Sequence, residues 1–87
     1  MKKQKLPKWF RGELYTHGAE VTNPFSGESY ELTAEELSIY DFIIGAQMVF
    51  GEKNILIKTK INLQKEIAKA LSWFRTNNAK AYMVLLD

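Results

Sequence analysis

TAEELSIYDFIIGAQMVFG, residues 33–51, is the stretch that decides the fold of this chain. Thr33 is followed three residues later by Glu36, which is the spacing of a capping box. In that motif the threonine hydroxyl accepts a hydrogen bond from the amide of the third helical residue, and the glutamate accepts one from the threonine amide. The pattern predicts a helix from Ala34 to about Phe50, with Gly51 at the position just past its end.

Apolar side chains cover most of the circumference of this predicted helix. Only a narrow stripe of small or polar residues interrupts them: Ala34, Ser38, Asp41 and Gly45. A helix that is apolar on so many sides is buried on several of them or shared with another chain. A chain of 87 residues has little else with which to cover it. We therefore expect this helix to form the core and to favour self-association.

On the N-terminal side, the sequence predicts an antiparallel three-stranded meander over residues 9–32. Aromatic residues typical of strands occur between positions 9 and 15, and residues 19–23 and 29–32 form two further short segments. Between them lies Asn23-Pro24-Phe25-Ser26-Gly27, a hairpin signal, because proline presets one turn dihedral and glycine accepts a positive φ. We interpret residues 1–8 as a flexible basic leader.

On the C-terminal side, residues 33–87 are predicted to be mainly helical. Residues 52–58 fit either a short strand or an early helical turn. Residues 59–76 form an amphipathic pattern with one apolar stripe. Asn77-Asn78 can cap a last short helix, for which a strand over residues 82–86 is the alternative. The predicted fold is a single α+β domain over residues 1–87, with the meander packed on two or three helices.

Composition excludes several kinds of active site. The chain has no cysteine, and therefore no disulfide or cysteine-based zinc site, and its single histidine rules out a histidine metal cluster. His17 lies in a Thr-His-Gly sequence and is interpreted as an exposed turn residue. No phosphate-binding glycine loop or nucleophile motif occurs. The longest apolar run, residues 39–50, is too short to cross a bilayer. We expect no catalytic residue, cofactor, metal or membrane partner, and a cytoplasmic location.

Charge is sorted by position along the chain. Residues 1–11 carry five basic groups and no acid, residues 12–52 carry eight acids and no lysine or arginine, and residues 53–87 carry seven basic groups and two acids. The blocks are thus +5, −8 and +5, which sum to +2. Such asymmetry concerns partners rather than fold. We expect a non-enzymatic interaction or accessory module in which the acidic middle of one chain faces the basic end of a second copy or of another protein.

Asp41 is the acid that stands inside the apolar run. It is interpreted as exposed on the small stripe, with a desolvated carboxylate and an ion pair to a C-terminal lysine as alternatives. The candidate interaction residues are Asp41, Gly45, Phe50 and Trp73.

The basic leader supports an alternative function. It interleaves cations with an aromatic pair, as proteins that bind single-stranded nucleic acid do. The candidate nucleic-acid contacts are Lys2, Lys3, Lys5, Lys8, Trp9 and Arg11. A solvated tail and a core anchor are the competing interpretations of these residues, and nucleic-acid binding is the less favoured function.

Three strings carry a resemblance: NPFSGE at 23–28, LSIYDFIIG at 37–45 and WFRTNNAKAYMVLLD at 73–87. On these the chain resembles small uncharacterised proteins of tailed marine viruses of cyanobacteria (cyanophages). The resemblance covers nearly the whole length but contains no mechanistic motif, so it assigns no role to any residue. It implies the host cytoplasm during infection as the setting, and a host or viral protein as partner.

Overall fold

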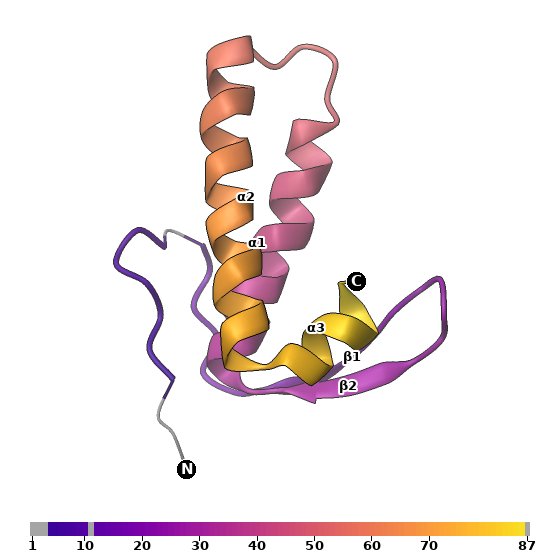
Figure 1. Ribbon diagram of the computed structural model, residues 1–87. Helices are drawn as coiled ribbons and strands as arrows, with labels where there is room; N and C mark the ends of the chain where they lie inside the picture. Colours follow the sequence, from indigo (N-terminus) through magenta and orange to yellow (C-terminus); the bar gives the residue numbers. More distant parts are fainter. Residues whose placement is uncertain (1–3, 11, 87) are drawn as a thin grey trace.

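A computed structural model describes residues 4–10 and 12–86 of the chain, and these form two strands and three helices. Their order is β1 (Ala19–Thr22), β2 (Ser29–Leu32), α1 (Ala34–Phe50), α2 (Ile57–Asn77) and α3 (Ala79–Leu85). The predicted α+β class is confirmed. Helices α1 and α2 form a long hairpin that rises away from the sheet, while α3 lies at its base (Figure 1).

The β1–β2 hairpin is closed by the turn that the sequence predicts. The strands are antiparallel, and Val21 faces Tyr30 in the register. At the turn, the Asn23 amide donates to the Glu28 carbonyl over 2.8 Å. Gly27 has a φ of 76°, which glycine adopts without steric cost.

The third strand of the predicted meander is wrong, because the sheet of the described residues has two strands. Residues 9–10 turn instead: the Phe10 amide donates to the Pro7 carbonyl over 3.1 Å. Their rings pack on α1, with the Phe10 and Phe42 centroids 5.7 Å apart. Further on, the Tyr15 amide donates to the Ser38 hydroxyl over 3.0 Å rather than to a neighbouring strand. Phe10 and Tyr15 therefore contact side chains of α1 instead of pairing with a neighbouring strand.

Both predicted helix caps are present. The Glu36 amide donates to the Thr33 hydroxyl, and the Thr33 amide donates to the Glu36 carboxylate, which completes the capping box. The Asn78 side chain accepts from the Ala81 amide over 3.1 Å and begins α3. The alternative strand over residues 82–86 is therefore wrong. Residues 52–56 form an irregular connection with a turn at residues 53–54, and α2 begins at Ile57, so the strand alternative for residues 52–58 is wrong as well.

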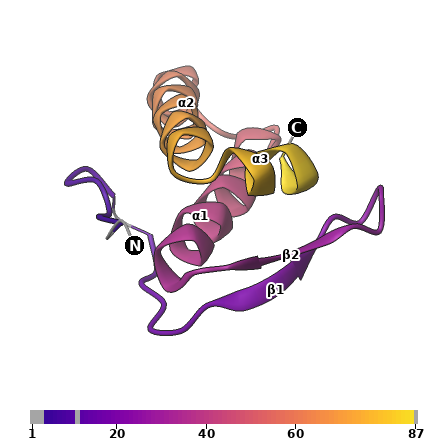
Figure 2. The same ribbon diagram turned by 60° about the horizontal axis from the view of Figure 1, so that its bottom comes forward.

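The core lies at the base of the hairpin, where both helices meet α3 and the sheet. In Figure 2, α3 lies between α2 and the sheet. The buried apolar cluster consists of Leu32, Ile39, Ile43, Ala70, Phe74, Ala81 and Leu85. Ser38, expected on the exposed stripe of α1, is buried here because its hydroxyl bonds both the Ala34 carbonyl and the N-terminal segment.

Glu36 joins three segments at this base. The residue is only 3% exposed. Its carboxylate accepts from the side-chain amides of Gln4 over 2.7 Å and Asn78 over 3.0 Å, and from the backbone amide of Thr33 over 3.0 Å. The expected flexible leader thus has a docked part, since Gln4 also accepts from the Thr33 hydroxyl. Residues 1–3 lie outside the described part of the chain.

Candidate protein-interaction surface

The outer half of the α1–α2 hairpin has no cover of its own. None of the residues from Gln47 to Lys69, all of them described, is buried. On α1 the last buried residue is Ala46, and on α2 the first is Ala70. Beyond these positions the two helices pack mainly on each other, with Trp9 of the N-terminal segment beside residues 62–69 of α2. Such an arrangement cannot enclose the side chains that point outward at the end of the hairpin.

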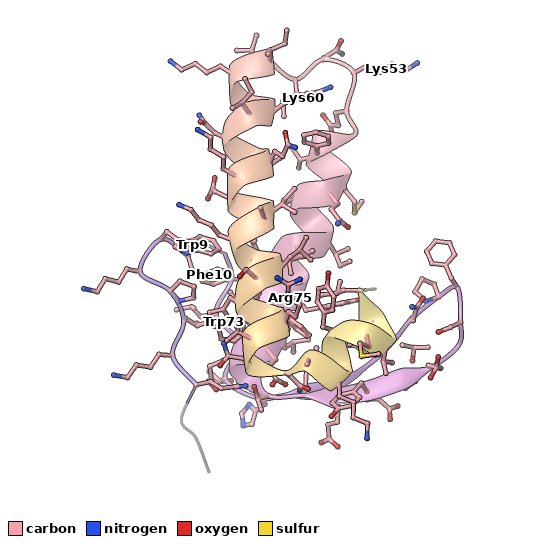
Figure 3. The ribbon with its side chains drawn as sticks, in the orientation of Figure 1. Trp9, Phe10, Lys53, Lys60, Trp73 and Arg75 are labelled. Atoms are coloured by element: carbon pink, nitrogen blue, oxygen red, sulfur yellow. The ribbon has the colours of Figure 1, made fainter. Side chains whose placement is uncertain are left out.

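Large apolar side chains concentrate in this outer half. Met48 is 73% exposed, Leu56 74% and Ile57 76%. Figure 3 shows the end of the hairpin standing far from the sheet, so neither β1 nor β2 covers it. The exposed set at this end, hereafter the apolar tip, consists of Met48, Val49, Phe50, Leu56, Ile57 and Ile61.

Two observations describe how the helices meet near the apolar tip. A shallow pocket of about 240 Å³ opens between them and is lined by Gln47, Phe50, Gln64 and Ile67. The Lys60 ammonium lies 5.7 Å from the centroid of the Phe50 ring, a cation–π contact. Phe50 is therefore held toward α2, and it lies at the tip as one of the predicted interaction residues.

The two ends of the molecule differ in charge. Lys53, Lys58 and Lys60 lie at the hairpin end, with Glu52 as their acidic neighbour (Figure 3). The sheet end is acidic, and there Glu20 stands opposite Glu31 in the register. Like charges in such a cross-strand pair are destabilising, so this sheet face favours a basic neighbour. The uneven distribution of charge along the sequence thus gives the folded chain a basic hairpin end and an acidic sheet end.

Asp41 and Gly45 lie on α1 below the apolar tip. Asp41 is exposed, as its helical position predicted. Desolvation, followed by the negative charges of Asp41 and Glu13, raises the pKa of the Tyr15 hydroxyl above its ordinary value. Gly45 is exposed, and a Cβ at this position would meet nothing within 4 Å. The surface beside Gly45 is therefore open.

Trp73 lies far from the other predicted interaction residues. It is half-buried at the lower part of α2, where its indole N–H donates to the Lys5 carbonyl over 3.0 Å (Figure 3). Its place beside the N-terminal segment assigns it to holding that segment rather than to the apolar tip.

The predicted nucleic-acid contacts are divided by the structure. Lys5 and Lys8 are exposed, and Trp9 is half-buried against Phe42, with ring centroids 5.9 Å apart. Lys2, Lys3 and Arg11 lie outside the described residues.

Sequence reasoning missed most of the apolar tip. Leu56 and Ile57 lie in the segment 52–58, for which the sequence left strand and helix open, and Met48 was not singled out. The length of the apolar pattern could have indicated this surface. The pattern continues to residue 50, whereas the sheet and α3 are too short to cover a helix of that length. Phe25, 97% exposed at the hairpin turn, was also missed as a surface residue.

Catalytic and metal-binding groups do not gather in the described residues. His17 is exposed, and its Nδ1 lies 2.9 Å from the Thr16 hydroxyl. No group of three or more metal-ligating side chains occurs in residues 4–10 and 12–86. Within the same residues, every helix is too short or too polar to cross a membrane.

Comparison with protein families, with characterised proteins and with solved structures found no match to this chain.

Proposed function

We propose that this protein is a non-enzymatic interaction module that self-associates through the apolar tip and the adjoining outer half of the α1–α2 hairpin. The observation that carries the proposal is the absence of any buried residue between Gln47 and Lys69, a described stretch that is rich in large apolar side chains. The setting implied by the resemblance to cyanophage proteins, the host cytoplasm during infection, is part of the proposal.

The size of the apolar tip supports a stable contact. Its six side chains together expose roughly 600 Å² of surface, if a large apolar residue is taken to expose about 180 Å² in full. Monomeric proteins seldom exceed about 300–600 Å² in one apolar patch. A standard interface covers about 800 Å² per partner. The tip and a few polar neighbours reach that size.

Charge favours a second copy as the occupant. In a pair of hairpins packed side by side in opposite directions, the lysines at each tip lie against the acidic sheet end of the partner. The lysines concerned are Lys53 and Lys58, and the acids include Glu31 and Glu35. Exposed ion pairs contribute only about 0–1 kcal/mol each, so they fix the direction of packing while apolar burial supplies the affinity.

The test is the molar mass in solution of the full chain and two variants, by light scattering over a range of concentrations. Wild type is expected to form dimers or larger assemblies. Leu56→Asp/Ile57→Asp is expected to be monomeric, because it places two charges in the apolar surface that the contact buries. Both side chains are largely exposed in the single chain, so the variant should keep its helical circular dichroism.

Leu14→Asp is the matched control, since Leu14 is 67% exposed but lies in the N-terminal region. It should associate like wild type. A wild type that is monomeric at all concentrations contradicts the proposal, and so does equal disruption by the control. Sedimentation of a monomeric wild type with anionic vesicles would assign the apolar tip to a membrane surface instead, and would also overturn the proposal.

A further inference from the structure

A second surface lies further along α2, beside the N-terminal segment, and includes no residue of the apolar tip. It is a polar groove of about 390 Å³ between the N-terminal segment and α2. The groove is lined by Trp9, Asn62, Lys65, Glu66 and Lys69. It brings together an aromatic ring from one end of the sequence and lysines from the other.

Trp9 is fixed in place by its neighbours. Its ring packs against Phe10 and Phe42, with centroid distances of 6.4 and 5.9 Å. The turn at Pro7 sets the backbone before it. Trp9 remains half-exposed and lines the groove, so part of the indole is accessible to a ligand. In Figure 3 the Trp9 and Phe10 side chains lie between the N-terminal segment and α2.

The N-terminal segment is itself anchored at two points before Trp9. Gln4 bonds Glu36, and the Lys5 carbonyl accepts from the Trp73 indole. These contacts use the Gln4 side chain and the Lys5 backbone, and the side chains of Lys5 and Lys8 are left exposed. The cations are therefore presented from a docked segment, not from a free tail.

Lys65 and Lys69 are four residues apart on α2 and so point to one side of the helix. Lys58, seven residues before Lys65, continues the same stripe. Ile57 and Ile61 continue the same row toward the apolar tip, since each is four residues from the next, but neither lines the groove. The groove therefore adjoins the apolar tip without sharing its residues.

We propose that this groove binds single-stranded nucleic acid. A base stacks on the accessible part of Trp9, while Lys65 and Lys69, which line the groove, and Lys5 and Lys8, which are exposed on the N-terminal segment, neutralise the flanking phosphates. Asn62 can donate to a base or a phosphate, and Glu66 accepts from a base amino group. An acidic peptide would satisfy the lysines but would leave the indole without a flat partner, so the combination of groups favours a nucleic-acid strand.

The test uses tryptophan fluorescence with an oligothymidylate as the probe. Trp73→Phe leaves Trp9 as the reporter, and wild type is titrated in parallel because the substitution also removes the indole contact that holds Lys5. Titration at low salt is expected to quench Trp9. With four lysines at phosphates, the logarithm of affinity should fall with the logarithm of salt with a slope of about −3.

Charge reversal then separates the groove from general attraction. In the Trp73→Phe background, Lys65→Glu/Lys69→Glu should weaken binding at least about tenfold and reduce the slope to about −1.4, since two phosphate contacts are lost. Lys53→Glu/Lys80→Glu is the matched control: it makes the same change in net charge at exposed positions that do not line the groove. The control should keep both the affinity and the slope within about twofold.

Four results would overturn the inference. They are no quenching at low salt, equal weakening by the two charge reversals, equal affinity for thymidine monophosphate, and equal affinity for polyglutamate. The first two remove the site, the third reduces it to a mononucleotide pocket, and the fourth assigns it to acidic peptides. The inference does not rest on self-association, because each titration can be repeated with the monomeric Leu56→Asp/Ile57→Asp variant.

Discussion

Replacement of Glu36 tests how the base of the molecule is held together. Its buried carboxylate accepts from Gln4, Asn78 and the Thr33 backbone. Loss of a hydrogen bond to a charged group costs about 1.5–3 kcal/mol when the donor stays buried. Here the side chains of Gln4 and Asn78 are half-buried and can turn partly to water, and removal of a buried charge offsets part of the loss. We therefore expect Glu36→Ala to lower the free energy of unfolding by about 3 kcal/mol.

That loss is large for a chain of this size, whose total stability is expected at about 4–13 kcal/mol. Urea unfolding followed by circular dichroism measures it. Glu36→Gln should cost about 2 kcal/mol, because its one amide oxygen replaces only one carboxylate oxygen and its NH2 group then faces a donor. Glu35→Gln is the matched control on the neighbouring position and should stay within about 0.5 kcal/mol of wild type. A Glu36→Ala variant as stable as the control would refute the view that this carboxylate joins the three segments.

Three further predictions concern single positions. Gly45→Ala should raise the free energy of unfolding by about 0.5–1 kcal/mol in urea melts, because Gly45 is in the interior of α1 and its added Cβ meets nothing; unchanged or lower stability would contradict this. Gly18→Ala should lower it by about 2 kcal/mol, since the new Cβ would overlap the Leu32 carbonyl oxygen, and a neutral effect would show that this close approach is not retained. Burial raises the pKa of the Tyr40 hydroxyl above its ordinary value of 10.0, so the unfolded chain loses this proton first and stability should fall as pH rises through about 10. Tyr40→Phe should reduce that fall and remove one of the two late-titrating tyrosines from the absorbance titration, leaving Tyr15, and an identical titration in the variant would contradict it.

How far the sequence predicts this fold depends on how local each interaction is. The capping box at Thr33 and the cap at Asn78 involve residues three positions apart, and both were predicted correctly. The hairpin turn ending at Gly27 was predicted for the same reason. In each case, the groups that pair are neighbours in the sequence, so their identities suffice.

The strand assigned to residues 9–15 failed because its partners are distant. The aromatic residues Trp9 and Phe10 suit a strand, yet Phe42 on α1 offers them a larger apolar contact. Ser38 was predicted on the exposed stripe of the helix, but it is buried beneath the segment that contains Tyr15, whose amide donates to the Ser38 hydroxyl. Neither pairing leaves a periodic signal, since the partners are more than twenty residues apart.

The candidate surfaces divide in the same way. The basic leader and its aromatic pair were recognised from the sequence, but the groove that joins Trp9 to Lys65 and Lys69 exists only once the chain has folded. The sequence likewise showed that the helix from Ala34 to Phe50 is apolar on nearly every side. It did not show which part would stay uncovered.

By itself, the sequence determined several local elements: the capped start of the first helix, the amphipathic pattern of the second and the turn of the hairpin. It also showed that charge and apolar residues are unevenly distributed. Tertiary structure decided which surfaces stay open. The sheet and α3 cover only the lower part of the α1–α2 hairpin, so the same apolar pattern forms a core below Ala46 and an exposed tip above it. The physical reason is that burial depends on what lies alongside a helix in space, whereas helix formation depends on residues within a turn or two along the chain.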